Sequence, residues 1–239
     1  LQDEEERLRK RYLDIMFNPE VDEMIEKRSK FLSATREFLL QSGFMEVETP
    51  ILENTTGGAE AKPFITHHNA LDIDFFLRIS PELWLKRLMV AGFPKVFEIG
   101  RIFRNEGMDA EHLQDYTQME CYQAYSDYEA GMKFVEEMYR FIAEKTFNTL
   151  KFTIKGFEID LGNKWEIYDY ADTIKKMTGV DITTADLKTI EIKLRDLKVD
   201  YDTKNGFNLT RAIDNLWKYC RKQIAGPGFL IGVPVMMEP

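Results

Sequence analysis

The stretch that decides the fold is "KVFEIGRIFRNE", residues 95–106, which the loop "GMDAEHLQD" joins to "YTQMECYQAYS", residues 116–126. Both runs contain alternating apolar residues and many aromatic or β-branched ones, which is typical of strands. A short connection between two such runs predicts an antiparallel hairpin. Helical patterns surround the strand patterns, so the sequence favours an α+β fold, an antiparallel sheet flanked by helices, over a doubly wound parallel sheet.

Alternation along each strand predicts which side chains share a face. The first strand places on one face Glu98, Gly100, Ile102, Arg104 and Glu106. The second strand places on one face Glu120, Tyr122 and Ala124. If these two faces coincide, Arg104, Glu106, Glu120 and Tyr122 form one patch, and we expect the loop to bring His112 and Tyr116 over it.

The simplest alternative is a surface hairpin whose arginine and glutamate side chains form solvated ion pairs. Two features argue against it: Arg104, His112 and Tyr116 lie in one region, and Glu82 of "SPEL" begins the neighbouring helical pattern. Arginine can bridge a phosphate and a carboxylate, carboxylates can hold an ammonium group, and an aromatic ring can stack on a base. The sequence has no Ser/His/Asp pattern, GxGxxG motif or Walker loop. The hairpin therefore suits an ATP-like ligand and one that bears an ammonium group.

Composition narrows the class of protein. The 239 residues are 44% hydrophobic and have a formal net charge of −9, which argues against non-specific nucleic-acid binding through bulk charge. Cys121 and Cys220 lie far apart in the sequence, so we expect neither a disulfide scaffold nor a zinc site. This use of cysteine predicts a cytoplasmic location. No apolar run is long enough to span a membrane.

The other patterns predict elements around the hairpin. Helices are expected at residues 20–42, 81–92, 127–148 and 208–225, with shorter ones from residues 169 and 184. Strands are expected at residues 74–80, as a pair within residues 152–162, and at residues 229–237. Pro50 makes residues 44–52 an edge or interface strand. His67 and His68 are expected in a turn.

Three stretches carry a resemblance to a known family. "FRNEGMDAEHLQDYTQMECYQAY", residues 103–125, resembles the second signature motif of class II aminoacyl-tRNA synthetases, in the form found in lysyl-tRNA synthetases. "GFMEVETPIL", residues 43–52, resembles the first motif, which in that family makes the dimer interface. Residues 57–101, from "GGAEAKPF" to "FEIGR", resemble the lysine-pocket stretch between the two motifs.

The resemblance implies a role for each matching residue of the lysine pocket. Gly58 would present its backbone to the bound lysine. Glu82 and Glu120 would hold the α-ammonium group. Tyr122 would lie beside the lysine side chain, near its ε-ammonium group.

On the ATP side the resemblance makes Arg104 the catalytic residue, bridging the amino-acid carboxylate and the α-phosphate. Asn105 and Glu106 would line the adenosine. His112, with neighbouring Leu113, would reach the outer phosphates, and Tyr116 would stack on adenine.

The reaction that the resemblance implies is the activation of L-lysine by ATP to lysyl-adenylate, followed by transfer to tRNA(Lys). Catalysis would consist of positioning and charge neutralisation at the α-phosphate, with Mg²⁺ assisting at the phosphates. The implied assembly is a homodimer through the region around Pro50.

The resemblance also implies a domain organisation. Residues 1–19 would be a linker that follows the family's anticodon-binding barrel, and residues 20–239 part of the catalytic domain, with the first and second signature motifs. The third motif and the metal ligands would follow Pro239, which leaves no metal site within this chain.

Two other functions stay open at this point. One is a paralogue that ligates a lysine-like amino acid to a protein acceptor, and the other is a non-catalytic dimerising module that binds an amino acid. Aspartate and asparagine enzymes share the hairpin, but Glu82, Glu120 and Tyr122 favour a cationic substrate.

Overall fold

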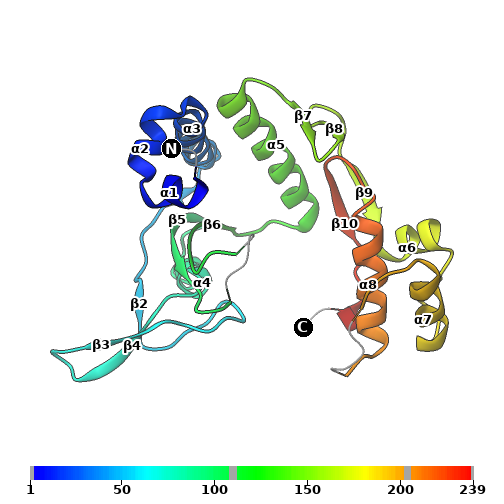
Figure 1. Ribbon diagram of the computed structural model, residues 1–239. Coiled ribbons are helices and arrows are strands. Elements are labelled where there is room, and N and C mark those ends of the chain that lie inside the picture. The colour runs from blue at the N-terminus through cyan, green and yellow to red at the C-terminus, as the bar shows by residue number, and fades with distance from the viewer. Residues whose placement is uncertain (1–2, 108–111, 202–205, 238–239) are drawn as a thin grey trace. The chain divides into compact units, whose positions relative to one another are not determined.

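The structure is a computed structural model that describes residues 3–107, 112–201 and 206–237 (Figure 1). The chain divides into two compact units, Leu1–Thr146 and Phe147–Pro239. The first unit contains the hairpin and every residue to which the sequence assigns a role in binding or catalysis. The predicted division into residues 1–19 and 20–239 concerns a neighbouring domain and stays a prediction.

The hairpin of the first unit confirms the predicted antiparallel pairing. β5 (Lys95–Phe103) and β6 (Asp115–Gln123) pair along their whole length, from Lys95 opposite Gln123 to Phe103 opposite Asp115. β1 (Met45–Glu46) adds to β5 in parallel, so the sheet has the order β1-β5-β6. The loop residues 108–111 lie outside the described part of the chain.

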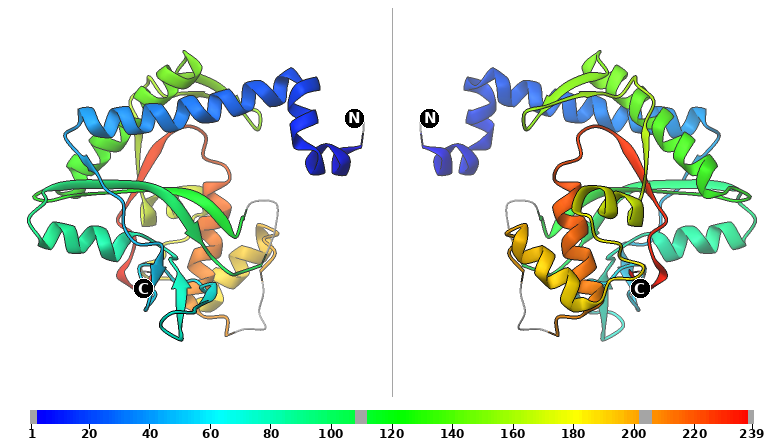
Figure 2. Two further views of the ribbon diagram at one scale, coloured as in Figure 1. Left: turned by 90° about the vertical axis from the view of Figure 1, so that its left-hand side faces the viewer. Right: turned by 90° about the vertical axis from the view of Figure 1, so that its right-hand side faces the viewer.

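One face of this sheet packs on the long helices. Phe97 of β5 is buried together with Leu39 and Phe44, and Met119 and Cys121 of β6 pack against them. Figure 2 shows α3 and α5 on one side of the hairpin and α4 on the other. The opposite face, with Glu98 and Glu120, is therefore turned away from this apolar core.

Three helices of the first unit, α3, α4 and α5, agree with the predicted helices, whereas α1 and α2 lie within residues 1–19, for which a linker was predicted. Their bounds are α1 Glu4–Arg9, α2 Arg11–Phe17, α3 Pro19–Gln41, α4 Glu82–Val90 and α5 Tyr128–Phe147. Pro19 begins α3 at a position that needs no amide hydrogen, and Gly43 follows its end with φ of +81°. Ala34 and Phe38 of α3 pack on Met138 and Ile142 of α5.

A second small sheet leads into the site. Its strands are β2 (Leu52–Glu53), β4 (Ile73–Leu77) and β3 (Ile65–His68), in the order β2-β4-β3, and all pairs are antiparallel. The expectation of a turn at His67 and His68 is wrong, because both lie in β3, opposite Asp74 and Ile73. The chain leaves β4 directly into Arg78, Ile79 and Ser80, which reach the hairpin.

Glu53 of β2 yields a prediction about stability and pH. Its side chain is buried, Oε1 accepts a hydrogen bond from the Trp84 indole at 2.7 Å, and Oε2 has no partner among the described residues. Burial raises the pKa of this carboxyl, against the opposing effects of Trp84, Arg78 and Arg87. The folded chain therefore binds this proton more tightly than the unfolded chain, and the carboxyl lowers the free energy of unfolding as pH rises through its folded pKa.

We expect Glu53→Gln, which keeps the acceptor for Trp84 but carries no charge, to unfold at higher urea than the parent at pH 8. The difference should shrink as pH falls through the ordinary pKa of a glutamate, below which Glu53 is protonated in both the folded and the unfolded state. Urea unfolding at several pH values measures this, with exposed Glu158→Gln as the control. A parent that is the more stable protein at pH 8 would contradict the interpretation.

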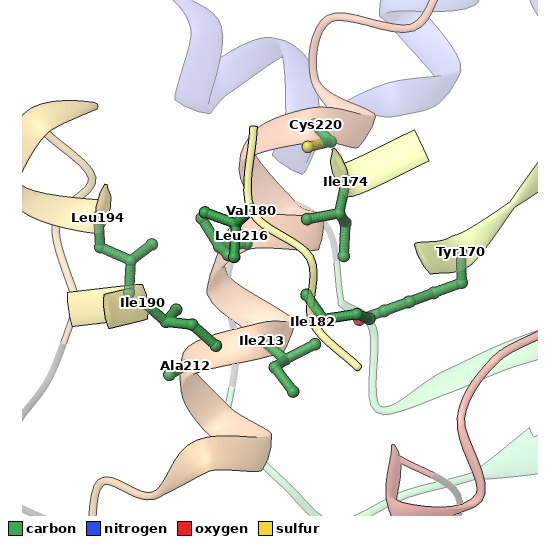
Figure 3. Packing of buried hydrophobic residues seen from close by; sticks show 10 residues of the cluster. All are labelled: Tyr170, Ile174, Val180, Ile182, Ile190, Leu194, Ala212, Ile213, Leu216 and Cys220. Atoms are coloured by element: carbon green, nitrogen blue, oxygen red, sulfur yellow. The ribbon is translucent and has the colours of Figure 1, made fainter. Parts of the chain in front are cut away.

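The second unit has its own apolar core, built mainly from three helices (Figure 3). Their bounds are α6 Tyr170–Thr178, α7 Leu187–Asp196 and α8 Leu209–Arg221. α8 presents Ala212, Ile213, Leu216 and Cys220 to the core, all fully buried. The strands are β7 (Lys151–Ile154) and β8 (Phe157–Asp160), an antiparallel pair, and β9 (Glu166–Asp169) and β10 (Gly228–Ile231).

Two details of this unit differ from the sequence prediction. The predicted strand 229–237 ends at Ile231, and Val235–Met237 forms a 3₁₀ turn after Gly232 and Pro234 interrupt the run. β10 pairs in parallel with β9, a strand that the sequence analysis did not identify. Among the described residues, no helix combines the length and the apolar character needed to cross a lipid bilayer.

Candidate active site

The site is built on the hairpin face that does not pack on α3. The strand register places Glu98 opposite Glu120, Gly100 opposite Gln118, and Ile102 opposite Tyr116. Paired residues of an antiparallel sheet share a face, so the predicted coincidence of the two polar faces is confirmed for Glu98 and Glu120.

Glu120 is the centre of the first group of site residues. Its Oε1 accepts hydrogen bonds from Ser80 Oγ at 2.9 Å and from Gln118 Nε2 at 2.5 Å, and its Oε2 accepts one from the Tyr122 hydroxyl at 3.0 Å. A carboxylate has about four acceptor positions, so these three bonds fix its orientation and leave room for a further donor. Glu120 is thus a fixed, negatively charged acceptor suited to a ligand's N–H group.

Tyr122 is held as a neutral phenol in this group. Burial raises its pKa well above the usual range, and the nearby charge of Glu120, its hydrogen bond to Glu120 and the charge of Glu82 act in the same direction. Tyr122 therefore keeps its proton at physiological pH and donates a hydrogen bond to Glu120. The effect of Glu82 is consistent with its carboxylate lying in the same region as Tyr122.

Gly58 and Glu82 also belong to this first group, and both come from the segment between the two motif-like stretches. The Glu82 amide donates to Ser80 Oγ at 3.0 Å, which ties the start of α4 to the serine that contacts Glu120. Glu82 Oε1 pairs with Lys86 Nζ at 2.5 Å. A methyl group on Gly58 would lie 2.9 Å from Glu82 Cβ and 3.0 Å from Ser80 Oγ, so the Gly58 backbone passes directly over them. The structure thus brings together Gly58, Glu82, Glu120 and Tyr122, and their roles in binding stay predictions.

We expect Gly58→Ala to weaken ligand binding as well as stability. Gly58 has φ of +85°, which costs an alanine about 1–2 kcal/mol, and the added methyl group would also push on Glu82 and Ser80. Gly43→Ala is the matched control, because Gly43 has φ of +81° and open space around it. Thermal unfolding and the KM for the amino acid separate the effects. Equal KM values for the two variants would contradict the placement of Gly58 in the site.

A second group lies towards the loop end of the hairpin. The Arg104 guanidinium is 5.7 Å from the centre of the Tyr116 ring, and its Nε donates to the Ile79 carbonyl at 3.3 Å. The Arg104 amide donates to the Gln114 carbonyl at 2.8 Å. Four residues of strand separate Tyr116 from Glu120, a rise of about 13 Å. Because Ile79 directly precedes Ser80, one short segment contacts both groups.

The remaining predicted ATP residues surround this second group. The Asn105 amide donates to the Lys62 carbonyl at 2.7 Å, and the side chains of Asn105 and Glu106 are exposed. His112 and Leu113 are exposed in the segment that leads into β6. The roles assigned to these four residues stay predictions.

Several functional residues were missed by the sequence analysis. Ser80 and Gln118 orient Glu120, and Arg78 is buried against Glu98 and Thr49. The signal available for Arg78 was an arginine inside the apolar strand pattern "DFFLRIS", because a charge at such a position requires a buried partner. Among the described residues, no three His, Cys, Asp or Glu side chains gather in a way that could hold a metal ion.

Comparison with known proteins places the chain in a family. Residues 3–239 match the family described as tRNA synthetases class II (D, K and N). The chain is 45% identical to the lysine–tRNA ligase of Thermoanaerobacter sp. (strain X514), 42% to that of Roseiflexus sp. (strain RS-1) and 43% to that of Thermotoga maritima. Each alignment covers the whole chain and 47–49% of the relative, so the chain spans about half the length of the curated relatives it matches. The chain belongs to the class II tRNA synthetases of the D, K and N group.

Proposed function

We propose that the full-length protein carrying this chain activates L-lysine with ATP to lysyl-adenylate and transfers the lysyl group to tRNA(Lys). The observation that supports this most strongly is the arrangement of two groups on one hairpin face. The carboxylates Glu82 and Glu120 lie at one end, and Arg104 with Tyr116 lies at the other. The names of the similar proteins agree with this substrate.

The first group suits an amino acid whose side chain is cationic. Glu120 is oriented by Ser80, Gln118 and Tyr122, all of which are neutral donors, so its negative charge is available to a ligand. In the proposed complex Glu120 and Glu82 accept from the α-ammonium group, and the Tyr122 ring lies along the side chain towards the ε-ammonium group. The side-chain carboxylate of an aspartate substrate would be repelled by the negative charges of Glu82 and Glu120.

The second group suits the nucleotide. In the proposed complex Tyr116 stacks on adenine, and Arg104 lies between the lysine carboxylate and the α-phosphate, where its planar guanidinium can donate to both. Asn105 and Glu106 line the adenosine, and His112 with Leu113 reaches the outer phosphates. Arg104 already lies against the Tyr116 ring, so the group that neutralises charge is held beside the stacking plate.

The proposed first step needs no protein nucleophile. A carboxylate oxygen of lysine attacks the α-phosphorus in line, the new P–O bond forms, and the bond to the β-phosphate oxygen breaks to release pyrophosphate. Arg104 stabilises the charge that develops on the α-phosphate oxygens. In the second step the terminal ribose hydroxyl of tRNA attacks the lysyl carbonyl, and AMP leaves.

Further partners belong to the same proposal. Mg²⁺ would supply additional charge neutralisation at the phosphates, but no metal-binding cluster lies among the described residues, and the roles above use protein groups alone. A homodimer through the region around Pro50 agrees with the exposed side chains of Met45, Ile51 and Leu52, which are 40–46% exposed. A cytoplasmic location is the setting that this reaction implies.

The experiment is ATP–pyrophosphate exchange by the full-length protein with each amino acid in turn, followed by charging of tRNA(Lys). We expect exchange with lysine alone and transfer to the tRNA. Lysine-dependent exchange with transfer only to a protein would favour the paralogue. Lysine binding without exchange would favour the non-catalytic module, and exchange with aspartate or asparagine would refute the substrate.

A further inference from the structure

A buried ion pair lies on the same hairpin face as Glu120. Arg78, which follows β4, is 1% exposed, and Glu98 of β5 is 4% exposed. Arg78 Nη1 donates to Glu98 Oε1 at 2.5 Å. Such a pair often adds little net stability compared with apolar side chains, so its presence beside a binding site calls for a reason.

The strand register supplies a reason. Glu98 and Glu120 are direct cross-strand partners, which places their Cβ atoms about 4.5–5.5 Å apart on one face. Two like charges at that separation repel each other, and the repulsion is greater where water is excluded. A cation beside Glu98 would remove this repulsion.

Arg78 forms its ion pair with Glu98, and no cationic side chain of the described residues pairs with Glu120. Both Glu98 oxygens are occupied, Oε1 by Arg78 and Oε2 by the Thr49 hydroxyl at 2.6 Å. Thr49 also accepts from Arg78 Nη1 at 3.0 Å, which closes a ring of three residues. Glu120, in contrast, accepts only from neutral donors among the described residues.

Gly100 makes room for this arrangement. A methyl group there would collide with the Arg78 guanidinium and lie 3.1 Å from Glu98 Oε1. Arg78 is fixed on its other side by the bond from its Nε to the Arg101 carbonyl at 3.0 Å. The guanidinium therefore lies over Gly100, whose cross-strand partner is Gln118, the residue that helps to orient Glu120.

We infer that Arg78 is a positioning residue for substrate binding: by neutralising Glu98 it leaves Glu120 as the charged acceptor of this cross-strand pair for the ligand's ammonium group. This inference rests on the lysine-binding role proposed above. Arg78 does not touch the substrate in this account. It acts through Glu98 and through the position of Glu120.

The test compares Arg78→Met with Arg78→Met/Glu98→Gln in the full-length protein. In the single variant Glu98 keeps its charge without a partner, and we expect the KM for lysine in pyrophosphate exchange to rise at least about tenfold. The KM for ATP should change less than about twofold, because Arg104 and Tyr116 are untouched. The double variant removes the charge of Glu98 with an isosteric amide, so it should recover most of the lost lysine affinity.

The outcomes separate this inference from the proposed function. A parent protein without lysine-dependent exchange refutes the proposed function itself. With an active parent, an unchanged KM for lysine in Arg78→Met, or a double variant no better than the single one, overturns the inference and leaves the ion pair a purely structural feature. If Arg78→Met does not fold, as judged by circular dichroism, Arg78→Lys serves instead. The ammonium group of this variant still neutralises Glu98, so the KM for lysine should stay within about twofold of the parent value, and a selective rise of about tenfold overturns the inference.

Discussion

Replacing Arg104 with alanine is expected to lower kcat for lysine-dependent pyrophosphate exchange by about a thousandfold. Arg104 is the only predicted site residue that can neutralise charge on the α-phosphate while also meeting the amino-acid carboxylate. Its position is set by the Ile79 carbonyl and the Tyr116 ring, and no carboxylate of the described residues forms an ion pair with it. Its charge is therefore available to the ligand, and it is needed most when the fifth oxygen approaches the α-phosphorus.

Arg101→Ala is the matched control for this prediction. Arg101 lies on β5, three residues before Arg104, but it is on the other face of the hairpin, is 56% exposed and pairs with Asp115 at the surface. Steady-state exchange kinetics with both variants measure the difference. Arg104→Lys should recover only part of the loss, because an ammonium group cannot donate to two oxyanions in one plane. Equal activity of the Arg104 and Arg101 variants would show that the second group does not contact the reacting phosphate.

The second large effect is expected for Glu120→Gln, which should raise the KM for lysine about a hundredfold and leave the KM for ATP nearly unchanged. The amide keeps the shape of the side chain and can still accept from Ser80, but it lacks the charge that attracts an ammonium group. Its NH₂ group would also face the Gln118 amide or the Tyr122 hydroxyl as a second donor. Lysine binding measured by calorimetry checks the result independently of turnover.

Glu158→Gln is again the control, because Glu158 is an exposed carboxylate on β8 that accepts from the Thr153 hydroxyl. A Glu120→Gln protein that binds lysine as tightly as the parent would refute the role of Glu120. A loss of affinity for ATP of the same size would instead indicate that the whole hairpin face has been disturbed.

Local patterns in the sequence predicted much of this fold. The two-residue period of the hairpin identified which side chains share a face, and helical spacing located α3 and α5 to within one or two residues. Both signals come from residues close together in the chain. The alternation also placed Glu98 and Glu120 on potentially coincident faces before any pairing was known.

Features that depend on long-range pairing escaped prediction. β9 is four residues long and has no pattern that marks it as a strand, and it is defined by its parallel pairing with β10. His67 and His68 have polar neighbours typical of a turn, yet hydrogen bonding to β4 makes them a strand. Glu98 lies opposite Glu120 because of the strand register. The sequence alone does not determine this register, because the residues at which the strands end and the loop begins are not known from it.

The site shows the same division between local and long-range information. Gly58, Glu82, Glu120 and Tyr122 were found from a resemblance and brought together by the structure. Ser80 and Arg78 act through contacts between segments far apart in the chain, and Gln118 orients Glu120 from two residues away on the same strand. Such supporting residues have no motif of their own, so only the packed structure reveals them.

The most direct test of the account is a crystal structure of the full-length protein with a non-hydrolysable lysyl-adenylate analogue. We predict that its α-ammonium group lies against Glu120 and Glu82, its phosphate mimic against Arg104, and its adenine on the Tyr116 ring. Binding of the analogue elsewhere, or with its adenine away from Tyr116, would contradict the claim that this hairpin face holds both substrates.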